Sequence, residues 1–362
     1  MSLSRTYNFC LFRLLVEARA SYSEAEFYCL AELWPITRRI FLHILVIKIR
    51  GFCNTDIYAI CELWNTHHAD VPGTQEMNPL RLELSCLAKP YFEPSQLLIA
   101  EEDLGTPLGF IHFGPVAAQN GDDVEQNANA IHALCVRPDA REAEVAGLLL
   151  SQLKLSGEQR AVAFRPTLPN AAYYLGVAPA DAISGVIAEE YRLCNWLSAA
   201  GFAPGTPTCL WELQLAFFQP PVDRNQIQIR RSCQVESNED AELPWWHACV
   251  LGHAEPATFE LRRKADRQLL TSSLFWSLAA EMQDPTQSAY WWWPKFTPED
   301  NVNTNQRLHL LAESLRALQQ SGVDVVRTST FVEDSEQADI LHRLGFSPAS
   351  NGMLFSKPQD ES

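Results

Sequence analysis

Positive charge is scarce in this chain of 362 residues, where 28 Lys and Arg stand against 44 Asp and Glu and give a formal net charge of −16. Binding of nucleic acid through bulk electrostatics needs clustered cations, so the composition argues against that class of partner. Long apolar runs are also missing. The longest, residues 40–49, includes His43 and Lys48 and is far shorter than the roughly 20 apolar residues of a membrane helix. We therefore expect a cytoplasmic protein with neither a nucleic-acid nor a membrane partner.

Recognisable motifs for metal binding and covalent catalysis are absent as well. The ten cysteines include no Cys-x-x-Cys pair, and no histidine spacing completes a zinc site, so the spacing predicts no metal. Reduced, mostly buried thiols are expected instead. The chain also lacks a Gly-x-Ser-x-Gly elbow and a P-loop. These absences argue against the corresponding serine-nucleophile and nucleotide-binding classes.

The charge is unevenly distributed along the chain. Residues 1–50 carry seven Lys and Arg against four Asp and Glu, whereas the remaining 312 residues have a net charge of −19. The first 45 residues also have weak helical patterns and no counterpart elsewhere in the sequence. We therefore interpret residues 1–45 as an N-terminal extension and leave its structure open.

Internal similarity is the most informative feature of the remainder. The stretches IKIRGFCNTD, from Ile47, and IQIRRSCQVESNED, from Ile227, both predict a short strand, a polar turn and a following helix that contains Trp. A Gly-Phe pair late in each half, at 201–202 and at 345–346, repeats the correspondence. The sequence therefore predicts two related halves.

The boundary between the halves is placed at the adjacent prolines after residue 218. The predicted domains are 46–218, with an insertion near 167–189, and 227–358, joined by a polar, proline-containing linker at 219–226. Hydrophobic periodicity predicts the elements of each domain. In the first we expect strands at 97–103, 108–114, 130–136, 161–166 and 210–215 and helices at 56–68 and 189–200. In the second we expect strands at 290–294, 323–330 and 353–357 and helices at 241–252, 307–322 and 335–346.

One stretch of the first domain has the pattern of an anion site. The strand that ends at Val136 is followed by Pro138 and by a helix in which Val145 and Leu149 recur at helical spacing. A helix N-terminus beside a strand end offers unpaired backbone N–H groups and the positive end of the helix dipole, which suits a pyrophosphate. The corresponding stretch of the second domain is 299–311.

This pattern resembles the GNAT superfamily of N-acetyltransferases, whose usual string at this place is V-x-P-x-x-R-G-x-G-I-G-x-x-L-L. Seven positions of the string are kept, namely Val136, Pro138, Arg141, Val145, Ala146, Leu149 and Leu150. The hairpin before the string and AAGF at 199–202 also match, and the second domain matches more weakly. The resemblance implies an α/β (α+β) fold class with tandem GNAT folds, each a mixed central sheet flanked by helices.

The resemblance also implies an activity. A GNAT enzyme takes acetyl-CoA as co-substrate and moves the acetyl group to an amine, here of an unknown small molecule or peptide, while a general base accepts the amine proton. The second domain is degenerate at the loop, with Arg307 where a small residue is expected, so the first domain is favoured as the binder. The implied acetyl-CoA-binding residues are Leu134, Cys135, Val136, Arg141, Glu142, Ala143, Glu144, Val145 and Ala146.

The chain departs from the family pattern at positions that matter chemically. Glu142 and Glu144 replace loop glycines that let the backbone approach the phosphates, and two carboxylates there would repel a pyrophosphate. The tyrosine that often serves as general acid falls on Leu197 in the first domain and on Leu341 in the second. Neither leucine can transfer a proton.

The catalytic residues therefore stay open. The candidates are His132, on the strand that ends at Val136, Tyr174, in the insertion, and Tyr191, at the start of the last helix of the first domain. The alternative to an N-acetyltransferase is a catalytically inactive tandem GNAT protein that acts as a ligand-binding or structural module. The sequence leaves that choice, the acceptor and the oligomeric state undecided.

Overall fold

The computed structural model describes residues 47–357 apart from a set of short gaps. The gaps are 72–73, 103–104, 119–122, 140, 155–160, 166–172, 178–184, 240–241, 244, 279–281, 283–288 and 294–301. Two compact units are distinguished, Met1–Lys48 with Glu102–Thr106 and Ile49–Glu101 with Pro107–Ser362, and every contact discussed below lies within the second. The N-terminal extension at 1–45 lies outside the described residues, as does most of the insertion near 167–189.

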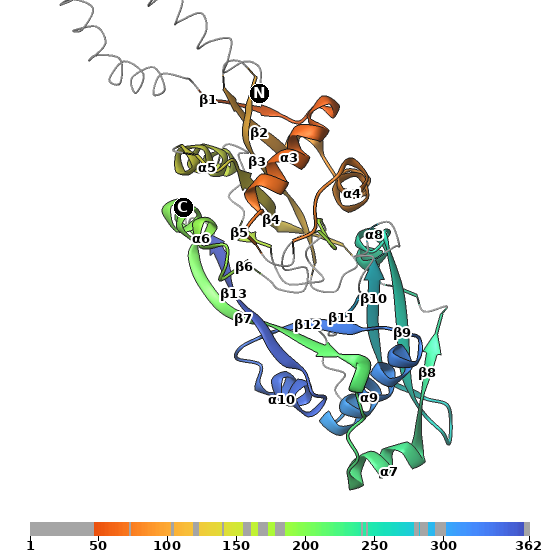
Figure 1. The fold of residues 1–362 in the computed structure, drawn as a ribbon. Coiled ribbons are helices and arrows are strands. Elements are labelled where there is room, and N and C mark those ends of the chain that lie inside the picture. Colours follow the sequence, from red (N-terminus) through yellow and green to blue (C-terminus); the bar gives the residue numbers. More distant parts are fainter. Residues whose placement is uncertain are drawn as a thin grey trace, which may run out of the picture. The chain divides into compact units, whose positions relative to one another are not determined.

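The strands among the described residues join in one mixed sheet (Figure 1). They are β1 (Ile47–Gly51), β2 (Leu97–Glu102), β3 (Pro107–Ala117), β4 (Val124–Val136), β5 (Ala161–Phe164), β6 (Val186–Ile187), β7 (Ala203–Gln214), β8 (Cys233–Asn238), β9 (Ala254–Arg263), β10 (Leu269–Leu278), β11 (Ala289–Trp293), β12 (Val325–Phe331) and β13 (Ser347–Lys357). The order along the sheet is β1-β2-β3-β4-β5-β13-β7-β12-β11-β10-β9-β8, and β6 pairs with β13 off this path. The pairs β4–β5 and β11–β12 are parallel.

Helices cover the sheet. They are α3 (Ile57–His67), α4 (Pro79–Leu82), α5 (Glu142–Ser151), α6 (Tyr191–Ala199), α7 (Arg224–Ser232), α8 (Trp245–Val250), α9 (Thr304–Gln320) and α10 (Ser335–Arg343). Short 3₁₀ or π turns are η1 (Asn54–Asp56), η2 (Glu83–Leu87), η3 (Pro94–Gln96), η4 (Gln152–Lys154) and η5 (Leu215–Phe217). Both α3 and α5 contact β3 and β4, and they lie on opposite sides of these strands (Figure 1). None of the helices in the described part of the chain combines the length and apolarity that crossing a bilayer requires.

The two halves of the chain exchange their last strands. From one end of the sheet the first half contributes β1 to β5, and from the other end the second half contributes β8 to β12. Between them β13 pairs with β5, and β7 pairs with β12, so each half completes the sheet of the other. A side-chain bond reinforces the second exchange, because the indole N–H of Trp211 on β7 donates to the hydroxyl of Thr330 on β12 at 2.9 Å.

Most of the elements expected from hydrophobic periodicity are confirmed where the chain is described, and several strands are longer than the pattern indicated. Helix α9 illustrates the local reasons. Asn303 caps its N-terminus in a capping box with Gln306, which satisfies two backbone N–H groups at the helix start. Leu308, Leu311 and Leu315 lie on one face at helical spacing and are buried in the core of the second half.

The prediction of a strand at the start of the IQIR stretch is wrong. Residues 227–230 lie in helix α7, and the strand of the second half, β8, begins only at Cys233. The cause is local, because Asp223 caps the helix by accepting a hydrogen bond from the backbone N–H of Gln226 at 2.8 Å. Helix α7 thus begins inside the predicted linker, and Ile227 is exposed instead of packing on a sheet.

Candidate functional site

Strands β4 and β5 separate before β4 ends. Their parallel pairing covers only Ala128–Ile131 of β4 and Ala161–Phe164 of β5, and the backbone N–H of Arg165 still donates to the carbonyl of Ile131 at 2.9 Å. Beyond that point β4 continues to Val136, and no strand of the described residues pairs with it on this side. Because backbone groups alternate along a strand, Leu134 and Val136 direct theirs toward the opening. An unpaired strand edge of this kind can bind an extended ligand.

A β-bulge marks the place where the two strands separate. In the β3–β4 pair His112 lies opposite Ala133 and Phe113 opposite Ile131, so His132 is the extra residue. The His132 side chain is buried, and its Nε2 has no hydrogen-bond partner among the described residues. Burial holds the pKa of His132 well below its usual value, so the imidazole is neutral and keeps a lone pair.

Tyr173 lies against this histidine, whereas the Tyr174 hydroxyl lies near His112 and Cys86. The Tyr173 ring packs edge-on to His132 at a centroid distance of 4.5 Å, and its hydroxyl is buried without a partner in the described part of the chain. The Tyr174 hydroxyl lies 3.1 Å from Nδ1 of His112 and 3.5 Å from Sγ of Cys86. Burial raises the pKa of Tyr174 well above its usual value, so the phenol stays protonated.

The edge of β4 at Val136 is covered by a histidine from α3. Nδ1 of His67 lies 3.2 Å from the carbonyl oxygen of Val136 and 3.4 Å from its amide nitrogen. Burial lowers the pKa of His67 to about 4, so this ring is also neutral near pH 7. His67 therefore occupies the backbone groups that an extended ligand would use at Val136.

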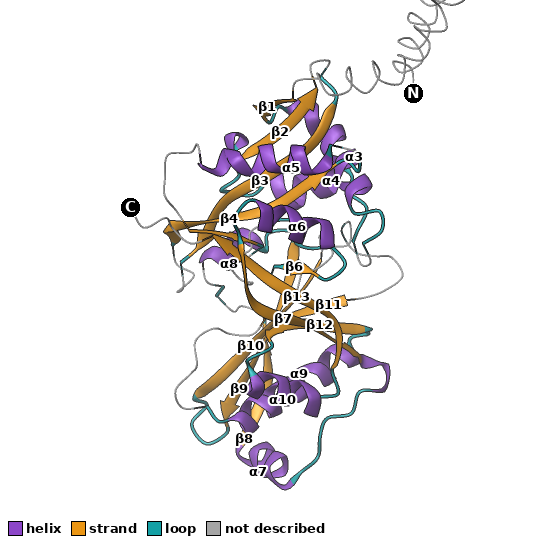
Figure 2. Ribbon diagram, turned by 90° about the vertical axis from the view of Figure 1, so that its left-hand side faces the viewer, coloured by secondary structure: helices purple, strands orange, loops and turns teal. Residues whose placement is uncertain are grey.

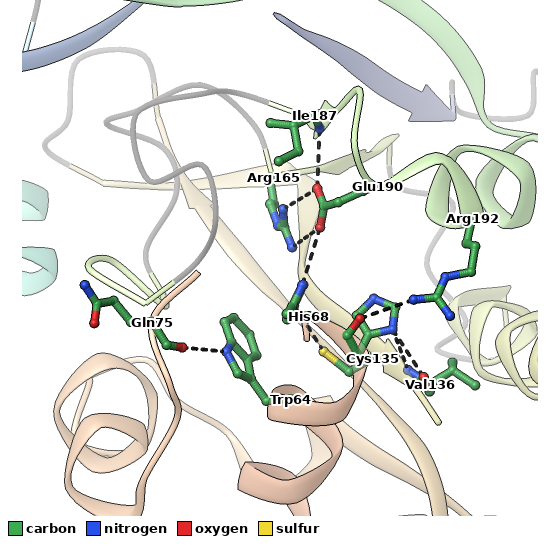
Figure 3. Close-up of polar contacts among 10 residues, drawn as sticks. Trp64, His68, Gln75, Cys135, Val136, Arg165, Ile187, Glu190 and Arg192 are labelled. Carbon is green, nitrogen blue, oxygen red and sulfur yellow. Dashed lines mark hydrogen bonds and ion pairs between the residues drawn. The ribbon is translucent and has the colours of Figure 1, made fainter. Parts of the chain in front are cut away.

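The next residue, His68, lies between a thiol and a carboxylate (Figure 3). Its Nε2 is 3.7 Å from Sγ of Cys135 on β4, and its Nδ1 is 3.9 Å from Oε1 of Glu190. Glu190 is in turn bound by the Arg165 guanidinium at 2.9 and 3.2 Å in a buried, bidentate ion pair. Residues from α3, β4, β5 and the turn before α6 thus meet in one buried cluster.

The predicted pyrophosphate loop lies at the start of α5, and both of its carboxylates are paired with arginines. The Glu144 carboxylate forms an ion pair with Arg141, with Oε2 2.9 Å from the guanidinium Nε. Glu142 lies 3.3 Å from the guanidinium of Arg192, which comes from α6. Asp139 accepts a hydrogen bond from the backbone N–H of Arg141 at 2.7 Å. The repulsion expected from Glu142 and Glu144 is therefore offset by adjacent positive charge.

A groove of about 630 Å³ runs between α5 and α6. The two helices lie side by side (Figure 2). One wall of the groove includes Ala143, Gly147 and Leu150, and the other includes Tyr191, Arg192 and Trp196. Gly147 has open space where a side chain would point. The groove is continuous with the predicted loop, because Glu142 and Ala143 line it as well.

The structure thus brings some predicted residues together and separates others. Leu134, Cys135 and Val136 form the end of β4, and the predicted loop residues form the first turns of α5 beside the groove. Val145 and Ala146 are buried in the core.

The three catalytic candidates occupy different places. His132 lies in the bulge, and Tyr174 is held by His112 and Cys86. Tyr191 is exposed on α6, where it lines the groove.

Sequence reasoning missed the residues that cover β4. His67 and His68 end a predicted helix, and Glu190 and Arg192 flank the start of another, but no spacing rule links these segments to each other. The adjacent histidines were the available signal, and the contact of His67 with Val136 spans 69 residues of sequence.

At the corresponding place in the second half, the start of α9 is capped by its own side chains and bonded to α10. Asn303 and Gln306 exchange hydrogen bonds across the first turn of α9. The hydroxyl of Thr304 donates to Glu336 of α10 at 2.6 Å, which joins the starts of the two helices. This contact corresponds in position to the Glu142–Arg192 pair of the first half.

Comparison with known proteins identifies the fold. No family model and no curated protein matches the sequence. Among solved structures, a GCN5-related glucosamine N-acetyltransferase region of a fungal multi-domain GH3 β-N-acetylglucosaminidase matches with a TM-score of 0.65 and 14% identity, over 86% of this chain and 38% of that one. The present chain therefore spans well under half of that protein.

Two further structures match over almost their whole length. A tandem GNAT protein from the clavulanic acid biosynthesis pathway has a TM-score of 0.55 and 10% identity, over 88% of this chain and 100% of that one. A GCN5-related N-acetyltransferase from Sphaerobacter thermophilus has a TM-score of 0.53 and 10% identity, over 86% and 95%. The chain has the GNAT fold, with a large mixed sheet flanked by helices, as the resemblance implied.

Proposed function

We propose that the chain is an acyl-CoA-dependent N-acyltransferase that moves an acetyl group from acetyl-CoA to the amine of a small molecule or peptide. One observation carries the proposal. Among the described residues, the edge of β4 that faces away from β3 has no strand partner beyond Ile131, and it runs from the His132 bulge to the start of α5. Structural neighbours described as N-acetyltransferases support the same general class.

The residues around β4 and α5 fit such a co-substrate after one rearrangement. Backbone groups of Leu134 and Val136 would hold its extended arm, once His67 leaves Val136. Backbone N–H groups at the start of α5, together with Arg192, would hold its pyrophosphate. The groove between α5 and α6 would bind the remaining part of acetyl-CoA.

The reaction needs a proton acceptor, and His132 supplies one. Bound acetyl-CoA would provide an activated thioester that an amine can attack directly. Nε2 of His132, which is buried and has no hydrogen-bond partner in the described part of the chain, would accept the proton that the attacking amine loses. Burial lowers the pKa of His132 and so weakens it as a base, and a bound amine would have to offset that effect. Burial of His132 and Tyr173 keeps water away from this point.

The test is turnover. The full-length protein is incubated with acetyl-CoA and a panel of amines, covering amino sugars, polyamines and peptide N-termini, and free thiol is measured over time. We expect amine-dependent thiol release that is lost in His132→Gln. Absence of release with every amine, from a protein that binds acetyl-CoA, would reject the enzyme and favour the alternative described next.

The alternative is a tandem GNAT protein that binds a ligand without turnover. Two observations favour it, namely the contacts of His67 with Val136 and the Glu142–Arg192 ion pair beside the groove. Both occupy groups that an acyl-CoA would use. In this case acetyl-CoA binding is measurable, but no amine releases thiol.

A further inference from the structure

Three buried side chains near the end of β4 present ligand atoms to one another. His67 at the end of α3, His68 directly after it and Cys135 from β4 each offer one ligand atom, and these atoms all lie within 4.8 Å of one another. The Nε2 atom of His68 and Sγ of Cys135 are 3.7 Å apart. Zn–N and Zn–S bonds of about 2.0 and 2.3 Å at a tetrahedral angle place their ligand atoms at about this separation.

One of the two histidines, His67, has the outer partner of a metal-binding imidazole. In metal sites a ligating histidine donates its second ring N–H to a carbonyl or a carboxylate, which fixes the ring and directs its other nitrogen at the ion. Nδ1 of His67 lies 3.2 Å from the carbonyl oxygen of Val136. Nδ1 of His68 is buried and lies 3.9 Å from the Glu190 carboxylate, with no hydrogen-bond partner among the described residues. In His68, Nε2 is the atom that faces Cys135. In His67, Nδ1 is engaged at Val136, which leaves Nε2 to serve as the ligand atom.

The charges around the cluster permit a cation. The two nearby arginines are each paired, Arg165 with Glu190 and Arg192 with Glu142. On binding zinc, each histidine would bind as the neutral imidazole, and the Cys135 thiol would lose its proton to solvent and bind as the thiolate.

We propose that His67, His68 and Cys135 form a binding site for a zinc ion, with Nε2 of each histidine and Sγ of the cysteine as ligands. Two imidazoles and one thiolate are the ligand types that zinc prefers, and three protein ligands leave its fourth tetrahedral position open for water. Glu190 is the carboxylate beside Nδ1 of His68, at 3.9 Å.

The site has a consequence that rests on the proposed function. A zinc ion would hold His67 in its contact with Val136, where the arm of acetyl-CoA would bind. Zinc and acetyl-CoA would then exclude each other at the end of β4. Zinc binding itself needs no acetyl-CoA, so the two proposals can fail separately.

The experiment uses the full-length protein after removal of metal with a chelator. Co²⁺ replaces Zn²⁺ as a spectroscopic probe, and the thiolate-to-cobalt charge-transfer band is followed during titration. We expect the band to saturate at one Co²⁺ per chain, to disappear when Zn²⁺ is added and to be missing in Cys135→Ser. Cys86→Ser is the matched control, because Cys86 is also buried and its Sγ also lies near a histidine, 3.6 Å from Nδ1 of His112.

A second variant keeps the test decisive if Cys135→Ser does not fold. His68→Asn retains the thiol and removes one ligand, so zinc affinity measured by competition with a chromophoric chelator should fall by more than about 100-fold, the upper end for loss of an outer partner alone. Substoichiometric binding, a band that persists in Cys135→Ser, or an affinity unchanged in folded His68→Asn would overturn the proposal.

Discussion

The imidazole of His67 contacts both backbone polar groups of Val136, with Nδ1 3.2 Å from the carbonyl oxygen and 3.4 Å from the amide nitrogen. These are the last groups of β4 before the turn into α5, and no strand in the described part of the chain pairs with them on that side. The position of the His67 side chain therefore decides whether the end of β4 can bind an extended ligand.

Removal of that side chain should strengthen acetyl-CoA binding. His67→Ala uncovers the polar groups of Val136, and because a hydrogen bond of this kind contributes about 1 kcal/mol, the Kd should fall about fivefold. Isothermal titration calorimetry measures this Kd. His309→Ala is the control, since His309 is a buried helical histidine of the second half, bonded to Gln226. A weaker or unchanged affinity in folded His67→Ala would show that the ligand does not use Val136.

The ion pair across the groove gives a second prediction. Glu142→Gln removes a carboxylate beside the predicted phosphate site and releases Arg192, so acetyl-CoA affinity should rise about threefold at low salt and less at high salt. Glu313→Gln is the matched control, because Glu313 pairs with Arg316 within α9 of the second half. Equal effects of the two substitutions would exclude a local role for Glu142.

Proton transfer by His132 predicts a selective loss of turnover. His132→Gln keeps the polarity of the site but cannot accept a proton, so kcat should drop by about 100-fold or more while the Kd for acetyl-CoA stays within a factor of about two. Stopped assays and titration on the same preparation separate the two quantities. If kcat is retained, another group is the base.

Buried neutral histidines predict instability in mild acid. Burial lowers the pKa of His67 to about 4 and that of His112 to about 3, whereas the unfolded chain binds these protons near pH 6.5. The free energy of unfolding therefore keeps its full contribution from these neutral rings above pH 6.5. It decreases as the pH falls toward 4, because the unfolded chain takes up the protons first.

Urea unfolding at pH 7, 6 and 5 measures this dependence above the range in which most carboxylates titrate. His112→Phe removes one titrating ring and should reduce the slope of unfolding free energy against pH. A free energy of unfolding that is flat across this interval would contradict the burial of these rings.

The exchanged strands predict that the halves cannot fold apart. Residues 47–218 alone lack β13, which pairs with both β5 and β7, and β7 loses β12 as well. Exposed strand edges of this kind associate, so light scattering should find dimers or aggregates. Co-expression with residues 219–362 should restore a single 1:1 complex. A stable monomer of 47–218 with native circular dichroism would argue against the exchange.

Local patterns were enough to predict the segment from β4 to α5. Alternating apolar residues up to Val136, the break at Pro138 and the spacing of Val145 and Leu149 each report on the nearest neighbours in the chain. The exchange of β7 and β13 could not be read in this way, because it depends on which distant strand edge each one meets.

Dependence on distant contacts also explains why the strand at 227–230 was wrongly predicted and why the His68–Cys135–Glu190 cluster was missed. Residues 227–230 alternate like the strand at 47–51, yet the cap at Asp223 makes them helical. His68, Cys135 and Glu190 meet only because α3, β4 and the start of α6 converge at one point. The acetyl-CoA-binding residues expected on β4 and α5 stay a prediction that binding measurements have to test.

The most direct measurement is a calorimetric titration of acetyl-CoA into the wild-type protein and into Gly147→Phe. Gly147 lines the groove between α5 and α6 and has open space where a side chain would point, so phenylalanine fills the groove without strain in the helix. Gln228→Phe, on the exposed surface of α7, is the control. We expect the wild-type protein and the Gln228→Phe control each to bind one acetyl-CoA per chain. We expect Gly147→Phe to bind none. No heat with the wild type at millimolar acetyl-CoA, or unchanged binding in Gly147→Phe, would contradict it.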